Sequence, residues 1–241
     1  MFNKSELENW LKEIAGFLDR DCSIYLIGGC AMSFRGLKPA TKDVDIIVST
    51  KSEFTAFDNA VLKAGYGRKT DLTEEFYLTA LAVYEKDDSR IDVFLNEVGK
   101  MLKFTKSMKS RTILYKEFGH LKTFLASNED LFLFKAMTPR VADIDDCDRL
   151  MRENLDYNAI YDECIAQSGD EKQWYFWLYE KICSLENKNS IENPIKSRLF
   201  RIIQKNWKNR PTDFMCDVKD LNKHIMDENL LNELNKGRAA R

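Results

Sequence analysis

The sequence predicts an α+β fold, in which a sheet flanked by helices occupies residues 1–126 and an all-helical domain occupies residues 127–241. Two observations lead to this prediction. In the first part, short apolar runs of strand length alternate with amphipathic helical segments, and glycines or polar turns end several of them. In the second part, every periodic segment repeats its apolar residues at helical spacing.

The first part opens with a predicted amphipathic helix over residues 5–19, for which Ser5 is the expected N-cap. The run "SIYLIGG" (23–29) predicts a short buried strand that ends in glycines, and "CAMSFRG" (30–36) predicts a helix of about two turns. The remaining predicted elements are a loop at 36–42, a strand at 43–48, a helix at 51–66 capped near Ser52, strands at 76–85 and 90–96, and a hairpin at 111–126 that turns at Gly119.

The second part is predicted to be helical throughout. Its segments span 127–137, 141–154, 156–167, 171–186, 194–207 and 217–235. The aromatic cluster "WYFW" (174–177) falls in the fourth segment, where core packing is the expected role and contact with RNA is the alternative.

Composition indicates an ordinary soluble globular protein, with 44% apolar and 32% charged residues. No apolar run approaches the length of a membrane span, so no membrane association is expected. The six cysteines are scattered without a C-x-x-C pair and only two histidines are present, which disfavours a zinc site and indicates reduced thiols in a cytoplasmic protein.

The formal charge of −2 does not indicate nucleic-acid binding, although two stretches carry Lys and Arg without an acid. These are residues 100–116 and 196–210. Solvated faces are the expected role for such runs, and contact with phosphates is the alternative.

Two aspartates open the strand "DVDIIV" (43–48), at positions where a strand would ordinarily carry β-branched or aromatic residues. Because side chains alternate along a strand, Asp43 and Asp45 share one face, about 7 Å apart. Their charges repel unless a cation lies between them, and Mg²⁺ or Mn²⁺ prefers such carboxylates. Asp92, in the apolar strand "SRIDVFL", is the candidate third acid of a site for two ions, which could hold the attacking and leaving oxygens at a phosphorus atom.

The glycine pair Gly28-Gly29 lies where a predicted strand passes into a helix. Backbone without Cβ atoms can approach a phosphate closely and donate its N–H groups. Phosphate held by backbone and metal held by acids together favour a nucleoside triphosphate as the ligand.

The stretch "LIGGCAMSFRGLKPATKDVDIIV", together with "RIDVF", resembles the DNA polymerase β-like nucleotidyltransferase superfamily. Its usual pattern is an apolar residue, Gly, Gly or Ser, a gap, and then Asp-apolar-Asp-apolar, which matches residues 27–29 and 43–46 here. The resemblance covers roughly residues 22–95 and implies a mixed sheet flanked by helices. It implies that Asp43, Asp45 and Asp92 are catalytic and bind metal, and that a nucleoside monophosphate passes from a triphosphate to a hydroxyl acceptor.

The resemblance also indicates which residues would bind the nucleotide. Cys30 stands where many relatives have serine, so Ser33 is the candidate to replace that hydroxyl. Arg35 and Lys42 flank the site and are candidates for phosphate contacts, with solvated loop charges as the alternative. Enzymes that add CCA to tRNA share part of the pattern, but they have an Arg-Asp pair after the glycines that this chain lacks.

Residues 126–151, "ASNEDLFLFKAMTPRVADIDDCDRLM", resemble the helices that follow the core in bacterial and archaeal nucleotidyltransferase-like proteins, including toxins and antitoxins. On this likeness Lys135 is a candidate for binding the triphosphate, and Arg140, Asp143 and Asp146 are further candidates. The alternative is that Lys135 and Asp143 form an ion pair that ties two helices together.

The acceptor is left open between a small molecule such as an aminoglycoside or lincosamide antibiotic, an RNA 3′ end and a protein hydroxyl. The alternative function is that of a catalytically silent nucleotidyltransferase-fold protein that binds a partner, as an antitoxin does. A DNA-binding regulator is the least favoured class, since no recognition helix is evident.

Overall fold

The structure is a computed structural model that describes residues 2–69, 80–99, 101–138, 140–169 and 172–207. The chain forms two compact units, residues 1–131 and 132–241. The division falls inside helix α5 (Asn128–Ala136), a few residues beyond the expected boundary at 126. The predicted helix at 217–235 and most of the N-terminal half of the predicted strand at 76–85 lie outside the described residues.

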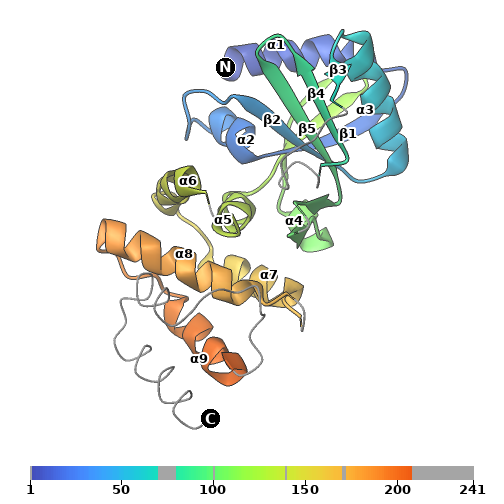
Figure 1. Cartoon of the computed structure of the whole chain (residues 1–241). Helices are drawn as coiled ribbons and strands as arrows, with labels where there is room; N and C mark the ends of the chain where they lie inside the picture. Colours follow the sequence, from blue (N-terminus) through green and yellow to red (C-terminus); the bar gives the residue numbers. More distant parts are fainter. Residues whose placement is uncertain (1, 70–79, 100, 139, 170–171, 208–241) are drawn as a thin grey trace. The chain divides into compact units, whose positions relative to one another are not determined.

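The first unit combines helices with a seven-stranded mixed sheet, so the predicted α+β class is confirmed (Figure 1). The strand order is β3-β4-β5-β2-β1-β9-β8, with β1 parallel to β9 and β2 parallel to β5. The sheet strands are β1 (Cys22–Ile27), β2 (Asp43–Val48), β3 (Gly67–Arg68), β4 (Ala82–Lys86), β5 (Ser89–Leu95), β8 (Ile113–Phe118) and β9 (Leu121–Leu125). The helices are α1 (Lys4–Ala15), α2 (Gly28–Phe34), α3 (Lys51–Lys63) and α4 (Lys106–Ser110).

A small second sheet pairs β6 (Glu97–Val98) with β7 (Leu102–Lys103), and the sequence patterns did not predict it. Each of its strands has only two residues. A period of two cannot be recognised over such a length, which explains why it was missed.

Helices α1 and α3 cover one face of the large sheet. Trp10 of α1 packs edge-on against Phe57 of α3, with ring centroids 6.5 Å apart. The hydroxyl of Tyr84, on β4, donates a hydrogen bond to Asp58 of α3. Tyr84 is in register with Ile91, and Ile91 with Val44, so these side chains share the face that the helices cover.

The first turn of α1 corrects one expectation. The N-cap is Asn3, not Ser5: the Asn3 side chain accepts from the N–H of Glu6 at 3.0 Å, and the Glu6 carboxylate accepts from the N–H of Asn3 at 2.8 Å. Helix α3 begins at Lys51 as expected, but its N-cap is Thr50, where the sequence predicted a cap near Ser52. In both cases the capping residue stands two positions before the expected one, with a glutamate three residues after it.

In the second unit, the elements described after α5 are α6 (Val141–Met151), α7 (Tyr157–Gln167), α8 (Trp174–Asn189) and α9 (Lys196–Asn206). The cluster "WYFW" begins α8, and its residues Trp174, Tyr175 and Phe176 are buried. Core packing therefore explains these three aromatic residues.

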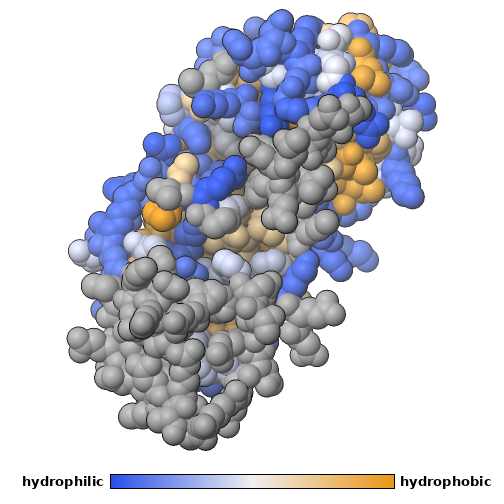
Figure 2. Space-filling model, viewed as in Figure 1, coloured by the Kyte–Doolittle hydropathy of each residue, from blue (hydrophilic) through white to orange (hydrophobic). Residues whose placement is uncertain are grey.

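Hydrophilic residues make up most of the coloured surface in Figure 2, with smaller hydrophobic patches between them. Within the described residues, none of the helices combines the length and the apolar character that a membrane crossing requires.

We expect Asn3→Ala to lower the free energy of unfolding by about 1 kcal/mol, because the substitution removes the capping box at the start of α1. Urea denaturation measures the change, and Ser5→Ala is the matched control. Equal destabilisation by the two substitutions would contradict the assignment of Asn3 as the cap.

Candidate functional site

The predicted acids lie on two neighbouring parallel strands. Strand β2 pairs with β5 so that Asp43 is opposite Arg90 and Asp45 is opposite Asp92. Paired residues of adjacent strands share a face, and residues two apart on one strand also share it. Three carboxylates and one guanidinium therefore occupy one face, opposite the face that carries Val44.

The glycine pair lies directly against Asp45. Strand β1 is antiparallel to β2, with Ile27 opposite Asp45. Gly28, the residue after Ile27, therefore lies beside Asp45. Gly28 has a φ of +60°, and a Cβ atom added there would lie 2.2 Å from Oδ2 of Asp45. No other residue fits this position, because both the backbone conformation and the carboxylate exclude a side chain.

Gly29 is similarly enclosed. A Cβ atom added there would lie 2.6 Å from Oγ1 of Thr41, whose hydroxyl donates to the carbonyl of Asp43 at 3.0 Å. The Nζ atom of Lys38 is 3.8 Å from the same position. The glycine pair and the loop that leads into β2 are thus packed together beside the acids.

Asp92 forms a bidentate ion pair with Arg90. The Nε and Nη2 atoms of Arg90 donate to the two carboxylate oxygens of Asp92 at 2.8 and 3.2 Å. The side chains are 16% and 8% exposed, so the pair is largely buried. Burial raises the pKa of Asp92 above its ordinary value, and Arg90 opposes this rise.

Across the described residues, no three histidine, cysteine or acidic side chains stand together in a way that could hold a metal ion. Asp43 and Asp45 carry oxygens of the kind that Mg²⁺ prefers. Both oxygens of Asp92 already accept from a guanidinium. An ion shared by all three acids would therefore have to compete with Arg90 for the oxygens of Asp92.

No family model matches this chain, and no curated protein does. A function for this chain is therefore inferred from the geometry of the site.

The other predicted nucleotide-binding residues of the first unit differ in their surroundings. The thiol of Cys30 is buried, with Sγ 3.0 Å from the carbonyl oxygen of Ile27, and burial raises its pKa so that it stays neutral. Ser33 is also buried, and its Oγ has no hydrogen-bond partner among the described residues. Arg35 donates from Nη2 to the carbonyl of Ala126 at 2.6 Å, while Lys42 is exposed.

Lys135 belongs to the second unit, where it lies between two aspartates of α6. Its Nζ is 2.6 Å from Asp143 and 3.0 Å from Asp146. Burial lowers the pKa of Lys135, but the two carboxylates more than offset this and raise it. Asp143 also accepts from Arg140 at 2.9 Å and from the hydroxyl of Thr138. The ion pair between α5 and α6, which the sequence offered as the alternative role for Lys135, is present.

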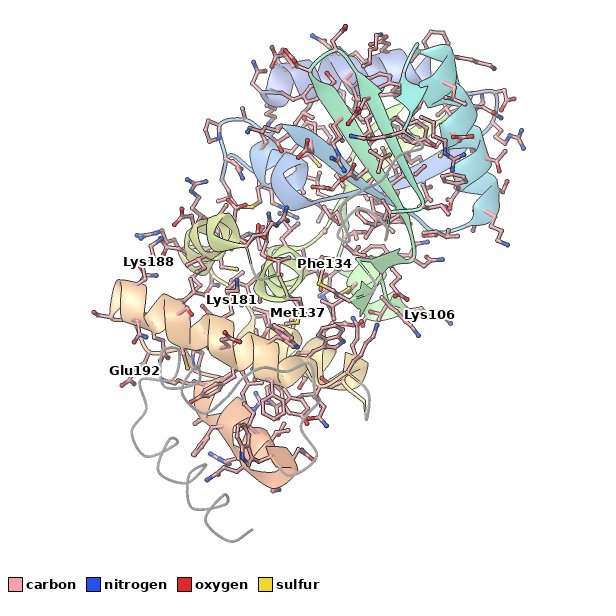
Figure 3. The ribbon with its side chains drawn as sticks, in the orientation of Figure 1. Lys106, Phe134, Met137, Lys181, Lys188 and Glu192 are labelled. Carbon is pink, nitrogen blue, oxygen red and sulfur yellow. The ribbon has the colours of Figure 1, made fainter. Side chains whose placement is uncertain are left out.

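Lys181 of α8 joins the same group of helices. It donates to the carbonyl of Thr138 at 2.8 Å, and burial lowers its pKa (Figure 3). Lys188, labelled on the same helix, pairs instead with Asp145 near the surface.

Sequence reasoning missed two cations near the acids, Arg90 and Lys38. Arg90 stands two residues before Asp92 in a strand, so period-two alternation could have placed it on the same face. Lys38 lies in a loop whose path no periodic pattern predicts.

Replacing Lys135 by methionine should lower the free energy of unfolding by about 3–5 kcal/mol, because it leaves two buried carboxylates without their cation. Lys188→Met, which breaks an exposed pair with Asp145, should cost less than about 1 kcal/mol. Denaturant unfolding of both variants measures the difference, and equal losses would contradict the buried role of Lys135.

The stability supplied by this pair should depend on pH at both extremes. The pKa of Asp143 is lowered from its ordinary value of 3.8, so its contribution is present above that pH and is lost as pH falls through the lower, folded-state value. The pKa of Lys135 is raised from 10.5, so its contribution is present below that pH and is lost as pH rises through the higher value. The stability gap between wild type and Lys135→Met should therefore be constant from about pH 5 to pH 9 and shrink outside this range, as measured by unfolding at several pH values.

Proposed function

We propose that this chain is a metal-dependent nucleotidyltransferase that moves a nucleoside monophosphate from a nucleoside triphosphate to a hydroxyl acceptor. The observation that carries the proposal is the placement of Asp45, which touches Gly28 on one side and is in register with Asp92 on the other. This brings a candidate phosphate-binding backbone and three acids, from three separate segments, to one place.

In this proposal the acids and the glycine pair have separate roles. Asp43 and Asp45 would hold Mg²⁺ or Mn²⁺, which supplies positive charge to the phosphates and lowers the pKa of the acceptor hydroxyl. Gly28 and Gly29 would let the backbone approach the triphosphate, and Lys38 would supply a positive charge beside them. Asp92 would accept the proton of the acceptor hydroxyl, with Arg90 holding its orientation.

Catalysis of this kind depends on positioning and charge more than on a strong base. Strands β2 and β5 suit this kind of catalysis, because their hydrogen-bonded register fixes the positions of the acids relative to one another. The proposal leaves the acceptor open between a small molecule, an RNA 3′ end and a protein, and it places the activity in the first unit.

One observation favours the alternative, a protein of this fold that binds nucleotide or a partner protein without turnover. Both oxygens of Asp92 are bound by Arg90, as they would be in a site that no longer needs the third acid. A silent protein would bind triphosphate without releasing pyrophosphate, and it would co-purify with a partner chain.

The decisive experiment follows the label from nucleoside triphosphates labelled at the α-phosphate. The protein is incubated with Mg²⁺ or Mn²⁺ and each triphosphate, against total tRNA, cell extract and a panel of antibiotics. Label on an acceptor, with pyrophosphate released, supports the proposal. Nucleotide binding without transfer under all these conditions supports the alternative.

We expect Asp45→Asn to abolish pyrophosphate release, since it removes one of the two acids proposed to hold the metal. The melting temperature should stay level or rise slightly, because a like-charge contact with Asp43 is relieved. Asp88→Asn, in the exposed turn between β4 and β5, is the matched control and should keep full activity. Full turnover in Asp45→Asn would refute the mechanism.

A further inference from the structure

Thr41, in the loop that leads into β2, touches both halves of the candidate site. Its hydroxyl donates a hydrogen bond to the carbonyl of Asp43 at 3.0 Å, on the strand that carries the acids. The same oxygen lies against Gly29, because a Cβ atom added at Gly29 would be 2.6 Å from it. Thr41 is buried, so water does not compete for these contacts.

The contact with Thr41 explains why position 29 carries no side chain. Gly28 has a positive φ and Gly29 does not, so the backbone at Gly29 would accept an alanine. The nearest atoms to an added Cβ belong to Thr41, with Oγ1 at 2.6 Å and Cβ at 3.3 Å. Space beside Thr41, and not backbone conformation, therefore excludes a side chain there.

The backbone of Thr41 is held by Phe2. The N–H of Phe2 donates to the carbonyl of Thr41 at 2.7 Å, and the N–H of Thr41 donates to the carbonyl of Phe2 at 2.9 Å. Phe2 is buried and directly precedes Asn3, the N-cap of α1. Thr41 is thus fixed twice, through its backbone by the segment before α1 and through its hydroxyl by β2.

We propose that Thr41 is a positioning residue that fixes the glycine turn relative to the acids of β2, so that phosphate and metal are bound together. The turn at Gly28-Gly29 begins α2, and a loop separates α2 from β2. A loop does not by itself set the distance between its two ends, whereas a buried side chain in contact with both ends does. This role rests on the proposed function, which assigns phosphate to the turn and metal to the acids.

The first test separates metal affinity from nucleotide affinity. Calorimetry measures the binding of Mn²⁺ alone and of a non-hydrolysable nucleoside triphosphate analogue with Mn²⁺ present, on the full-length protein. Thr41→Val should keep the wild-type affinity for Mn²⁺, because the pairing of β2 with β1 and β5 still places the acids. Its affinity for the analogue should fall about tenfold, as the lost hydrogen bond no longer holds the turn. Thr41→Ser keeps the hydroxyl and should restore the wild-type affinity.

Thr112→Val is the matched control. The hydroxyl of Thr112 donates to the carbonyl of Lys109 at 2.8 Å, between α4 and β8. The substitution removes the same type of hydrogen bond from a segment outside the candidate site. Both affinities should equal those of the wild type.

The second test addresses the contact itself and requires no ligand. In the wild-type background, Gly29→Ala forces a methyl group against Oγ1 of Thr41 and should lower the melting temperature. In a Thr41→Ala background that oxygen is absent, so the same substitution should lower the melting temperature less. The difference between the two losses measures the coupling of the two positions.

Wild-type affinity for the analogue in Thr41→Val would overturn the positioning role, and so would a loss of Mn²⁺ affinity by the same factor. Equal losses from Gly29→Ala in the two backgrounds would overturn the contact. If Thr41→Val does not fold, Thr41→Ala replaces it, and failure of both to fold would show a purely structural residue and overturn the role.

The outcomes for Thr41 and for the proposed function are distinguishable. Label transfer by the wild type, with unchanged analogue affinity in Thr41→Val, would keep the function and refute the positioning role. A selective loss of analogue affinity, without label transfer by the wild type, would do the reverse. A wild type that does not bind Mn²⁺, or does not bind the analogue, would refute both.

Discussion

The parallel pairing of β2 with β5 is the constraint on which the candidate site depends. It sets Asp45 beside Asp92 and Asp43 beside Arg90, and a shift of one residue would turn the acids of one strand to the opposite face. That shift would also bury charges against α1 and α3 and expose Val44 and Ile46. The burial of those apolar side chains therefore enforces the arrangement of the charged ones.

The order of segments around the site could be predicted, because each strand carries a local pattern. The strand "DVDIIV" alternates acids with apolar residues, and Gly28-Gly29 follows an apolar run. The pairing of β2 with β5 was not predictable from periodicity, since about forty residues separate the strands and the register depends on packing. The capping residue Asn3 was missed because Ser5 is also a good cap, and the two differ in their distance from Glu6.

The site residues show the same division between local and long-range information. Residue type and alternation were enough to select Asp43, Asp45 and Asp92. They could not show that Arg90 binds Asp92 or that Arg35 binds the carbonyl of Ala126, whereas the pairing of Lys135 with Asp143 was among the roles that the sequence offered. Each of these contacts depends on the conformation that a long, flexible cationic side chain adopts. A sequence pattern does not specify that conformation.

The two units share helix α5, and each of them holds one of its buried ion pairs complete. The first turns of this helix contribute Asp130, which accepts from Arg111 and Ser127, and the last turn contributes Lys135, the cation of Asp143 and Asp146. A fragment that ends before residue 128 would leave Arg111 without Asp130. A fragment that begins after residue 137 would leave Asp143 and Asp146 buried without Lys135, their cation. A cut between residues 131 and 132 would leave both sets of partners whole, so expression fragments should end and begin inside α5 rather than at either of its ends.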